Sequence, residues 1–217
     1  VQNSVSKYVI NRGMWSDADL RIRGLTGEEF WNFEAAPPKE AIDQWVRMLL
    51  EGGKLPAIGG SDAHGDFNSP TGIGKVRTIA KVGKNVSVRS VISALAAGRS
   101  VLTSGPFLEI TIVNEKKQSA GVGDSIKGKR LRVDVAALSN ADSGRIEEIR
   151  IYRGDTVKKT ETLEKTISTD PGDGGMKIVR ASAVTLAGGA GYIRAEASAA
   201  AGDGKTFAFT NPVWTEP

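Results

Sequence analysis

The chain of 217 residues has no cysteine, a single histidine and few aromatic residues, which make up 6% of it. The lack of cysteine excludes disulfides, thiolate zinc sites and thiol nucleophiles. Because His64 is the only histidine, any chemistry that needs an imidazole depends on that residue. No apolar run reaches the ~18 residues that a membrane helix needs, so a membrane is not an expected partner.

Neither positive nor negative charge predominates strongly in the chain. The chain has 29 Lys and Arg residues against 25 Asp and Glu, a net charge of +4. No basic block of the kind that neutralises a row of phosphates is present, so nucleic acid is not indicated as a partner. The composition, 40% hydrophobic and 25% charged, is typical of a soluble globular protein.

The first half of the chain alternates predicted helices with predicted strands. Helices are predicted over Pro38–Glu51 and over Val88–Ala97, the second with Ser87 as its N-cap. Short strands are predicted over Leu55–Gly60 and Ser100–Thr103. This alternation predicts an α/β domain over residues 1–105.

After Pro106 the hydrophobic period changes to two. Apolar residues alternate with polar ones around Leu108–Ile112 and Leu131–Val135, and the same pattern returns near the chain's end at Phe207 and Phe209. Turn-forming segments rich in Gly, Asn and Asp separate these runs. About seven short strands at this spacing predict an antiparallel β-sandwich over residues 106–217.

The segment Gly59–Asp66, with the sequence GGSDAHGD, is the most informative for chemistry. It follows a predicted buried strand, and α/β proteins place reactive groups at the carboxyl ends of such strands. Residues i and i+2 of an extended chain point the same way, so Asp62 and His64 can offer an oxygen and a nitrogen to one ion. That pair suits Zn²⁺, Mn²⁺ or Fe. Taken alone, the pattern also fits a plain Ser/Asp turn beside a solvated or buried histidine.

Several segments together resemble the C-terminal part of a PHP (polymerase and histidinol phosphatase) domain. They are Ile58–Gly65, Gly72–Gly74, Ala97–Pro106, Glu29–Asn32, Trp45–Leu50 and the closing Thr210–Trp214. The similarity is closest to the metal-dependent phosphoesterase-like branch in which a β-sandwich follows the PHP barrel. It covers residues 28–113 well and the rest loosely.

The resemblance implies a fold and an activity. The fold would be α/β followed by all-β: the C-terminal portion of a distorted (β/α)₇ PHP barrel plus an immunoglobulin-like antiparallel β-sandwich. The activity would be hydrolysis of a phosphate ester by water that two or three bound metals activate. Asp62 and His64 match the last two metal ligands of that family, and the implied partner is a small phosphorylated substrate.

The family's other histidines have no counterpart here, because His64 is the only one. A zinc-type site needs at least three protein ligands. Asp66, Glu29 and Glu34 are conceivable third ligands, although each also fits a surface carboxylate. The sequence begins at Val1, with neither a Met nor a signal segment, and this indicates the last part of a longer enzyme. We expect that part to be inactive alone. A divalent metal is expected in the full-length enzyme, whereas this part need not hold one.

Arg99, Thr103 and Ser104 are candidate substrate-binding residues. In the functional interpretation, the guanidinium and the two hydroxyls line a phosphate pocket. In the structural interpretation, Arg99 complements a helix C-terminus and Thr103 and Ser104 belong to a turn at a domain boundary. The residues alone leave both open.

A second function class is a β-sandwich that binds a glycan or a protein, with the metal-like loop as a remnant. The exposed strand edges of an incomplete α/β unit would also favour self-association. The lack of cysteine and a sandwich appendage fit an exported or periplasmic protein, although no signal segment shows it and a cytoplasmic location stays open.

Overall fold

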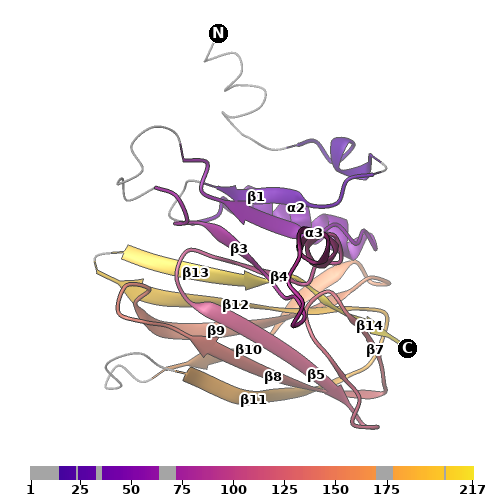
Figure 1. The fold of residues 1–217 in the computed structure, drawn as a ribbon. Coiled ribbons are helices and arrows are strands. Elements are labelled where there is room, and N and C mark those ends of the chain that lie inside the picture. Colours follow the sequence, from indigo (N-terminus) through magenta and orange to yellow (C-terminus); the bar gives the residue numbers. More distant parts are fainter. Residues whose placement is uncertain (1–14, 23, 33–35, 64–71, 170–177, 203) are drawn as a thin grey trace.

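A computed structural model describes residues 15–22, 24–32, 36–63, 72–169, 178–202 and 204–217 (Figure 1). Three layers are stacked in it. A four-stranded sheet forms one outer layer and an eight-stranded sheet the middle layer. A two-stranded sheet and helix α2 (Lys39–Leu50) cover the far side of the middle layer.

The four-stranded sheet has the order β11-β8-β5-β6, all antiparallel in the pairs that it forms. Its strands are β11 (Ile178–Ala187), β8 (Arg130–Leu138), β5 (Phe107–Asn114) and β6 (Ser119–Ala120). The period-two pattern explains which face is buried, because Leu131, Val133 and Val135 alternate with polar residues and all three are buried. The strands predicted around Leu108–Ile112 and Leu131–Val135 are confirmed.

The eight-stranded sheet has the order β10-β9-β12-β13-β4-β3, and β14 joins it beside β12 and carries β7. Its strands are β10 (Thr160–Ser168), β9 (Arg145–Asp155), β12 (Gly191–Ala201), β13 (Gly204–Thr210), β4 (Ser100–Thr103), β3 (Arg77–Ala80), β14 (Val213–Glu216) and β7 (Ser125–Lys127). Its inner face packs on the four-stranded sheet through Ile149, Ala197 and Ala208 among others.

The third layer consists of β1 (Glu28–Asn32), β2 (Ala57–Gly60) and α2. Two strands alone are marginal in water, and these are held by an aromatic cluster against the outer face of the eight-stranded sheet. Trp31 lies edge-on to Phe209, with ring centroids 5.7 Å apart, and Phe30 lies 5.3 Å from Trp45 of α2. Trp31 and Trp45 are fully buried, so this second core fixes β1 and β2 in place.

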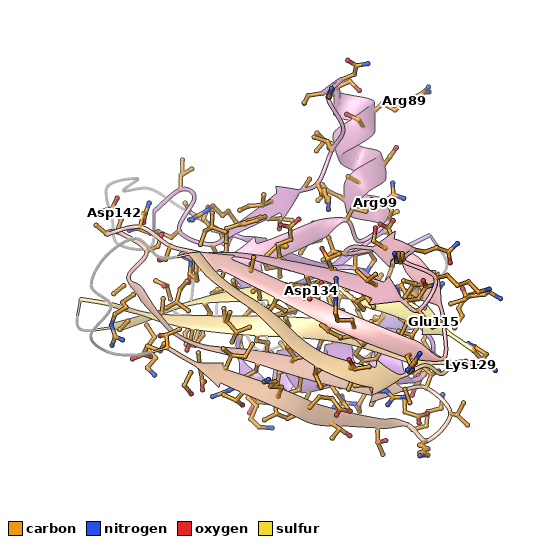
Figure 2. All side chains as sticks on the ribbon, turned by 90° about the horizontal axis from the view of Figure 1, so that it is seen from below. Arg89, Arg99, Glu115, Lys129, Asp134 and Asp142 are labelled. Carbon is orange, nitrogen blue, oxygen red and sulfur yellow. The ribbon has the colours of Figure 1, made fainter. Side chains whose placement is uncertain are left out.

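The two predicted helices are confirmed as α2 and α3 (Val88–Ala96). Ser87 caps α3 as predicted: its hydroxyl accepts a hydrogen bond from the Ser90 amide at 3.1 Å. In return the Ser90 hydroxyl accepts one from the Ser87 amide at 2.9 Å. Yet α3 stands away from the body of the molecule, with Arg89 at its far end and Arg99 at its base (Figure 2). Its apolar residues Val88 and Ile92 are 78% and 60% exposed, so little tertiary packing supports the helix.

Because α3 has so few buried contacts, its cap should matter. We expect Ser87→Ala to destabilise the helix by about 1 kcal/mol, seen as faster hydrogen exchange of the amides of residues 91–97. Ser93→Ala is the matched control, since Ser93 lies exposed on the same helix and away from the cap. Equal exchange in the two variants would show that the cap contributes nothing.

The predicted fold class is wrong. The described residues form two α-helices and 14 strands, and the strands make three sheets. This is a mostly β structure and not a PHP barrel portion followed by a β-sandwich. The strand Ser100–Thr103, expected in the barrel, pairs antiparallel with β3 and with β13 near the chain's end. The alternation of helices and strands led to the wrong fold class because it does not specify which strands pair with one another. β3 on one side and β13, more than 100 residues away, on the other satisfy the backbone groups of β4, and all four of its residues are buried.

Other expectations about the first half can be compared with the structure. The predicted boundary at Gly105 falls between β4 and β5, and strands from both sides of it share the eight-stranded sheet. Among the described residues, seven of the ten exposed large hydrophobic side chains precede it. Self-association through this half stays a prediction. None of the described helices is long and apolar enough to cross a membrane.

Candidate metal-binding site

The two strands that precede the predicted metal ligands lie side by side and run in the same direction. β1 and β2 are parallel, with Asn32 opposite Gly60 at their carboxyl ends. Buried Trp31 anchors β1, and Thr78 fixes β2 through its hydroxyl, which donates to the Gly59 carbonyl at 2.7 Å and accepts from the Gly59 amide at 2.8 Å. The chain that leaves β2 therefore starts from a rigid edge.

Asp62 lies two residues beyond this edge and is exposed. Its φ of 44° is in the left-handed region, where few residues other than Gly, Asn and Asp are found. A non-glycine residue in that conformation costs backbone energy, and such positions cluster at functional sites. The backbone thus turns sharply at the residue that the motif assigns to the metal.

Glu29, one of the conceivable third ligands, converges on the same place from β1. Its Oε1 closes over Gly60 so tightly that an added Cβ at Gly60 would collide with it. Glu29 is exposed as a residue, but partial burial of its carboxyl raises the pKa of that group, and the negative charge of Asp62 raises it further. Two carboxylates thus lie near enough to repel each other at the end of a parallel strand pair.

This arrangement suits a hard divalent cation, which prefers carboxylate oxygens and would remove the repulsion. Within the described parts of the chain no three His, Cys, Asp or Glu residues are grouped as metal ligands. His64, Asp66 and Glu34 lie outside the described residues. Glu29 and Asp62 therefore form the described part of the candidate site, and the role of His64 stays a prediction.

The structure does not bring Arg99 to this site. Gly98 lies beside Pro56, which precedes β2, whereas Asp62 follows the end of β2. The Arg99 guanidinium forms an ion pair with Asp124 at 3.0 Å. This placement favours the structural interpretation of Arg99.

Thr103 and Ser104 are used by the turn that they form. The Thr103 hydroxyl is buried, donates to the Pro106 carbonyl at 2.6 Å and accepts from the Gly105 amide at 2.9 Å. The Ser104 hydroxyl accepts from the Phe207 amide at 3.0 Å. Both contacts position the backbone, so neither hydroxyl points to phosphate binding.

Sequence reasoning missed a buried charge cluster under α2. Arg194 of β12 is 2% exposed and contacts Glu161 through two nitrogens at 2.7 and 2.8 Å. It also donates to Glu196, and its guanidinium lies over the rings of Trp45 and Tyr152. Burial alone would lower the pKa of Arg194, but the carboxylates of Glu161 and Glu196 outweigh it and raise the pKa. The Arg194 guanidinium is buried, the side chains of Glu161 and Glu196 are only 12% and 15% exposed, and the charges pair within the cluster, so it is a structural element.

Comparison with known proteins adds no relative: the chain matches no family model, no curated protein and no solved structure. The candidate site therefore stands on its own geometry and on the sequence motif.

Proposed function

We propose that this chain carries part of the divalent-metal site of a hydrolase that acts on phosphate esters. Glu29 and Asp62 supply carboxylate ligands, and His64, two residues along the chain, supplies an imidazole. The observation that carries the proposal is the approach of Glu29, the second residue of β1, to Gly60 and Asp62 at the carboxyl end of β2. The parallel strands β1 and β2, with the motif that follows β2, would contribute this ligand set. The proposal does not require a barrel fold.

The choice of a cation follows from the donor types. Two carboxylates and one imidazole match the mixed oxygen and nitrogen sets that hold Zn²⁺, Mn²⁺ or Fe. When bound, the metal would supply a Lewis acid for the phosphoryl oxygen and for an attacking water.

The residues of this chain have distinct parts in that site. Asp62 places a negative charge on a sharply turned, rigidly anchored backbone. Glu29 closes the site over Gly60, and its raised pKa means that a proton competes with the cation for its oxygens. Metal affinity should therefore rise with pH as Glu29 loses its proton.

The substrate class rests on the sequence motif. The segment Gly59–Gly65 and the segment Ala97–Pro106 resemble metal-dependent phosphoesterases, which supports a phosphate ester as the substrate. His64 is the only histidine, so this chain supplies a fraction of the ligands that such an enzyme uses, and we expect no turnover from it alone. Metal binding is therefore the direct test.

The test is titration of the chain with Mn²⁺, followed by the relaxation of water protons or by calorimetry. We expect Asp62→Asn and Glu29→Gln each to weaken Mn²⁺ binding at least tenfold, because each removes one charged ligand. Asn tolerates the left-handed backbone at position 62, so the first variant keeps the turn. Asp142→Asn is the matched control, since Asp142 is exposed in the turn between β8 and β9 and belongs neither to β1 nor to the segment that follows β2.

A second readout does not depend on metal affinity. Removing the charge at position 62 should lower the pKa of Glu29 toward its ordinary value of 4.5, measured on the ¹³C-labelled carboxyl. Mn²⁺ affinity that is the same in Asp62→Asn, Glu29→Gln, His64→Ala and the parent chain would refute the proposed site. So would an unchanged Glu29 pKa in Asp62→Asn.

A further inference from the structure

A cavity lies on the outer face of the eight-stranded sheet, where α2 begins. Its volume is about 220 Å³, below the roughly 300–1,000 Å³ of pockets for drug-sized ligands. It therefore has room for one ring. Its apolar lining includes Pro37, Ile42 and Phe207, and its polar lining includes Glu148, Arg150 and Ser198.

The strand register arranges the floor of this pocket in two rows. Glu196 of β12 lies between Arg150 of β9 and Phe209 of β13. In the next row Ser198 lies between Glu148 and Phe207. Each row thus runs from charged groups on one side to an aromatic ring on the other.

Ser198 is the unusual member of the floor. It is 7% exposed, and its hydroxyl has no hydrogen-bond partner among the described residues. A buried hydroxyl without a partner is unfavourable, and buried polar side chains nearly always find one. A ligand hydroxyl in the pocket would remove this cost, because a serine hydroxyl can both donate and accept.

The charges around the pocket are matched before any ligand arrives. Arg150 pairs with Glu148, and Glu196 pairs with buried Arg194. Lys205 pairs with Glu147, with 2.8 Å between its Nζ and Oε2. A charged ligand would have to break one of these pairs, so the pocket favours a neutral one. The carboxylates still accept and the guanidinium still donates, which suits neighbouring hydroxyl groups.

The opposite side of the pocket is apolar. Phe207 is half-buried, and Pro37 and Ile42 complete a wall that offers no hydrogen bonds. We propose that this pocket binds one pyranose ring of a neutral sugar. The C–H face of the ring lies against Phe207, and its hydroxyls reach Ser198, Glu148 and Arg150. The inference does not rest on the metal site, because none of these residues belongs to it.

Saturation-transfer NMR with glucose, galactose and N-acetylglucosamine tests the inference. The full chain is used in the presence of EDTA, so that the result is independent of metal binding. At up to about 10 mM sugar, ten times a millimolar dissociation constant, at least one sugar should show saturable transfer. Transfer should be strongest at the ring C–H protons that face Phe207.

Two variants and two matched controls locate the binding. Phe207→Leu and Ser198→Ala should each weaken binding at least tenfold. Phe107→Leu, a half-buried phenylalanine of β5, and Ser125→Ala, an exposed serine of β7, lie outside the pocket lining and should leave it unchanged. The inference is overturned if no sugar gives saturable transfer, or if Phe207→Leu and Ser198→Ala bind as tightly as the parent chain.

Discussion

Replacing Arg194 with alanine should lower the free energy of unfolding by about 3–5 kcal/mol, the range found when one partner of a buried ion pair is removed. Arg194 is fully buried and binds Glu161 with two nitrogens, while Glu196 takes a third. Its removal leaves the carboxylates of Glu161 and Glu196 close together under α2 without their cation. The measurement is urea unfolding followed by tryptophan fluorescence, to which Trp45, stacked on Arg194, contributes.

The tyrosine beside the cluster should not prevent this loss. Tyr192 donates its hydroxyl hydrogen to Glu161 at 2.7 Å, and burial followed by the charge of Glu161 raises the pKa of Tyr192. Without Arg194, the Tyr192 hydroxyl still donates a hydrogen bond to the Glu161 carboxylate. A neutral tyrosine cannot balance the carboxylate, so the desolvation cost of Glu161 is left uncompensated.

An exposed ion pair is the control for this experiment. Lys127 pairs with Glu216 at 3.4 Å, and their side chains are 74% and 42% exposed. Lys127→Ala should change stability by less than about 1 kcal/mol, because solvent screens such pairs. Combining Arg194→Ala with Glu161→Leu should restore part of the loss, since the second change removes a stranded charge. Equal losses in Arg194→Ala and Lys127→Ala would mean that the cluster is open to water.

The sequence predicted individual helices and strands better than it predicted which strands lie side by side. The helix that became α2 has proline before it, glycines after it and an apolar face with Trp45, and all of these signals lie within about a dozen residues. Likewise the alternation around Leu131–Val135 is enough to indicate a strand. Such local signals need no knowledge of the rest of the chain.

Pairing could not be predicted in the same way. Val101 of β4 lies opposite Thr210 of β13, more than 100 residues away, and no local pattern specifies that contact. The predicted fold class was wrong for this reason. Arg194 shows the same limit, because a charged residue in the alternating stretch of β12 predicts a solvent-facing side chain. The burial arises only when α2 closes over it.

The proposed metal site draws on the sequence for one residue and on the structure for another. A short motif after a strand was enough to single out Asp62, because the chemistry of the residue types is written in the sequence. Glu29 could be named only as one of three carboxylates. Its selection needed the parallel register of β1 and β2, which places its oxygen over Gly60.

The second large effect is expected at Glu28 and depends on pH. Glu28 opens β1 and is 5% exposed, and its Oε2 has no hydrogen-bond partner among the described residues. Burial raises its pKa from 4.5 to about 7, with a further contribution from the charge of Asp17. Asp17 itself stays ionised easily, because a hydrogen bond from Gln44 and the charge of Arg47 lower its pKa.

The direction of the pH effect follows from proton counting. Between pH 4.5 and about 7 the folded chain holds a proton on Glu28 that the unfolded chain has lost. Stability therefore falls as pH rises through this window. Each pKa unit corresponds to about 1.4 kcal/mol, so the loss attributable to Glu28 is about 3 kcal/mol, complete above pH 7.

Glu28→Gln isolates this contribution, because an amide is uncharged at every pH. At pH 8 the variant should be more stable than the parent chain by up to about 3 kcal/mol, and near pH 4 the two should be nearly equal. Urea unfolding at several pH values measures the difference. Glu109→Gln is the control, since Glu109 is exposed on β5 and its pair with Lys81 spans 3.7 Å. A stability difference between Glu28→Gln and the parent chain that does not vary from pH 4 to pH 8 would show that Glu28 ionises normally in the folded state.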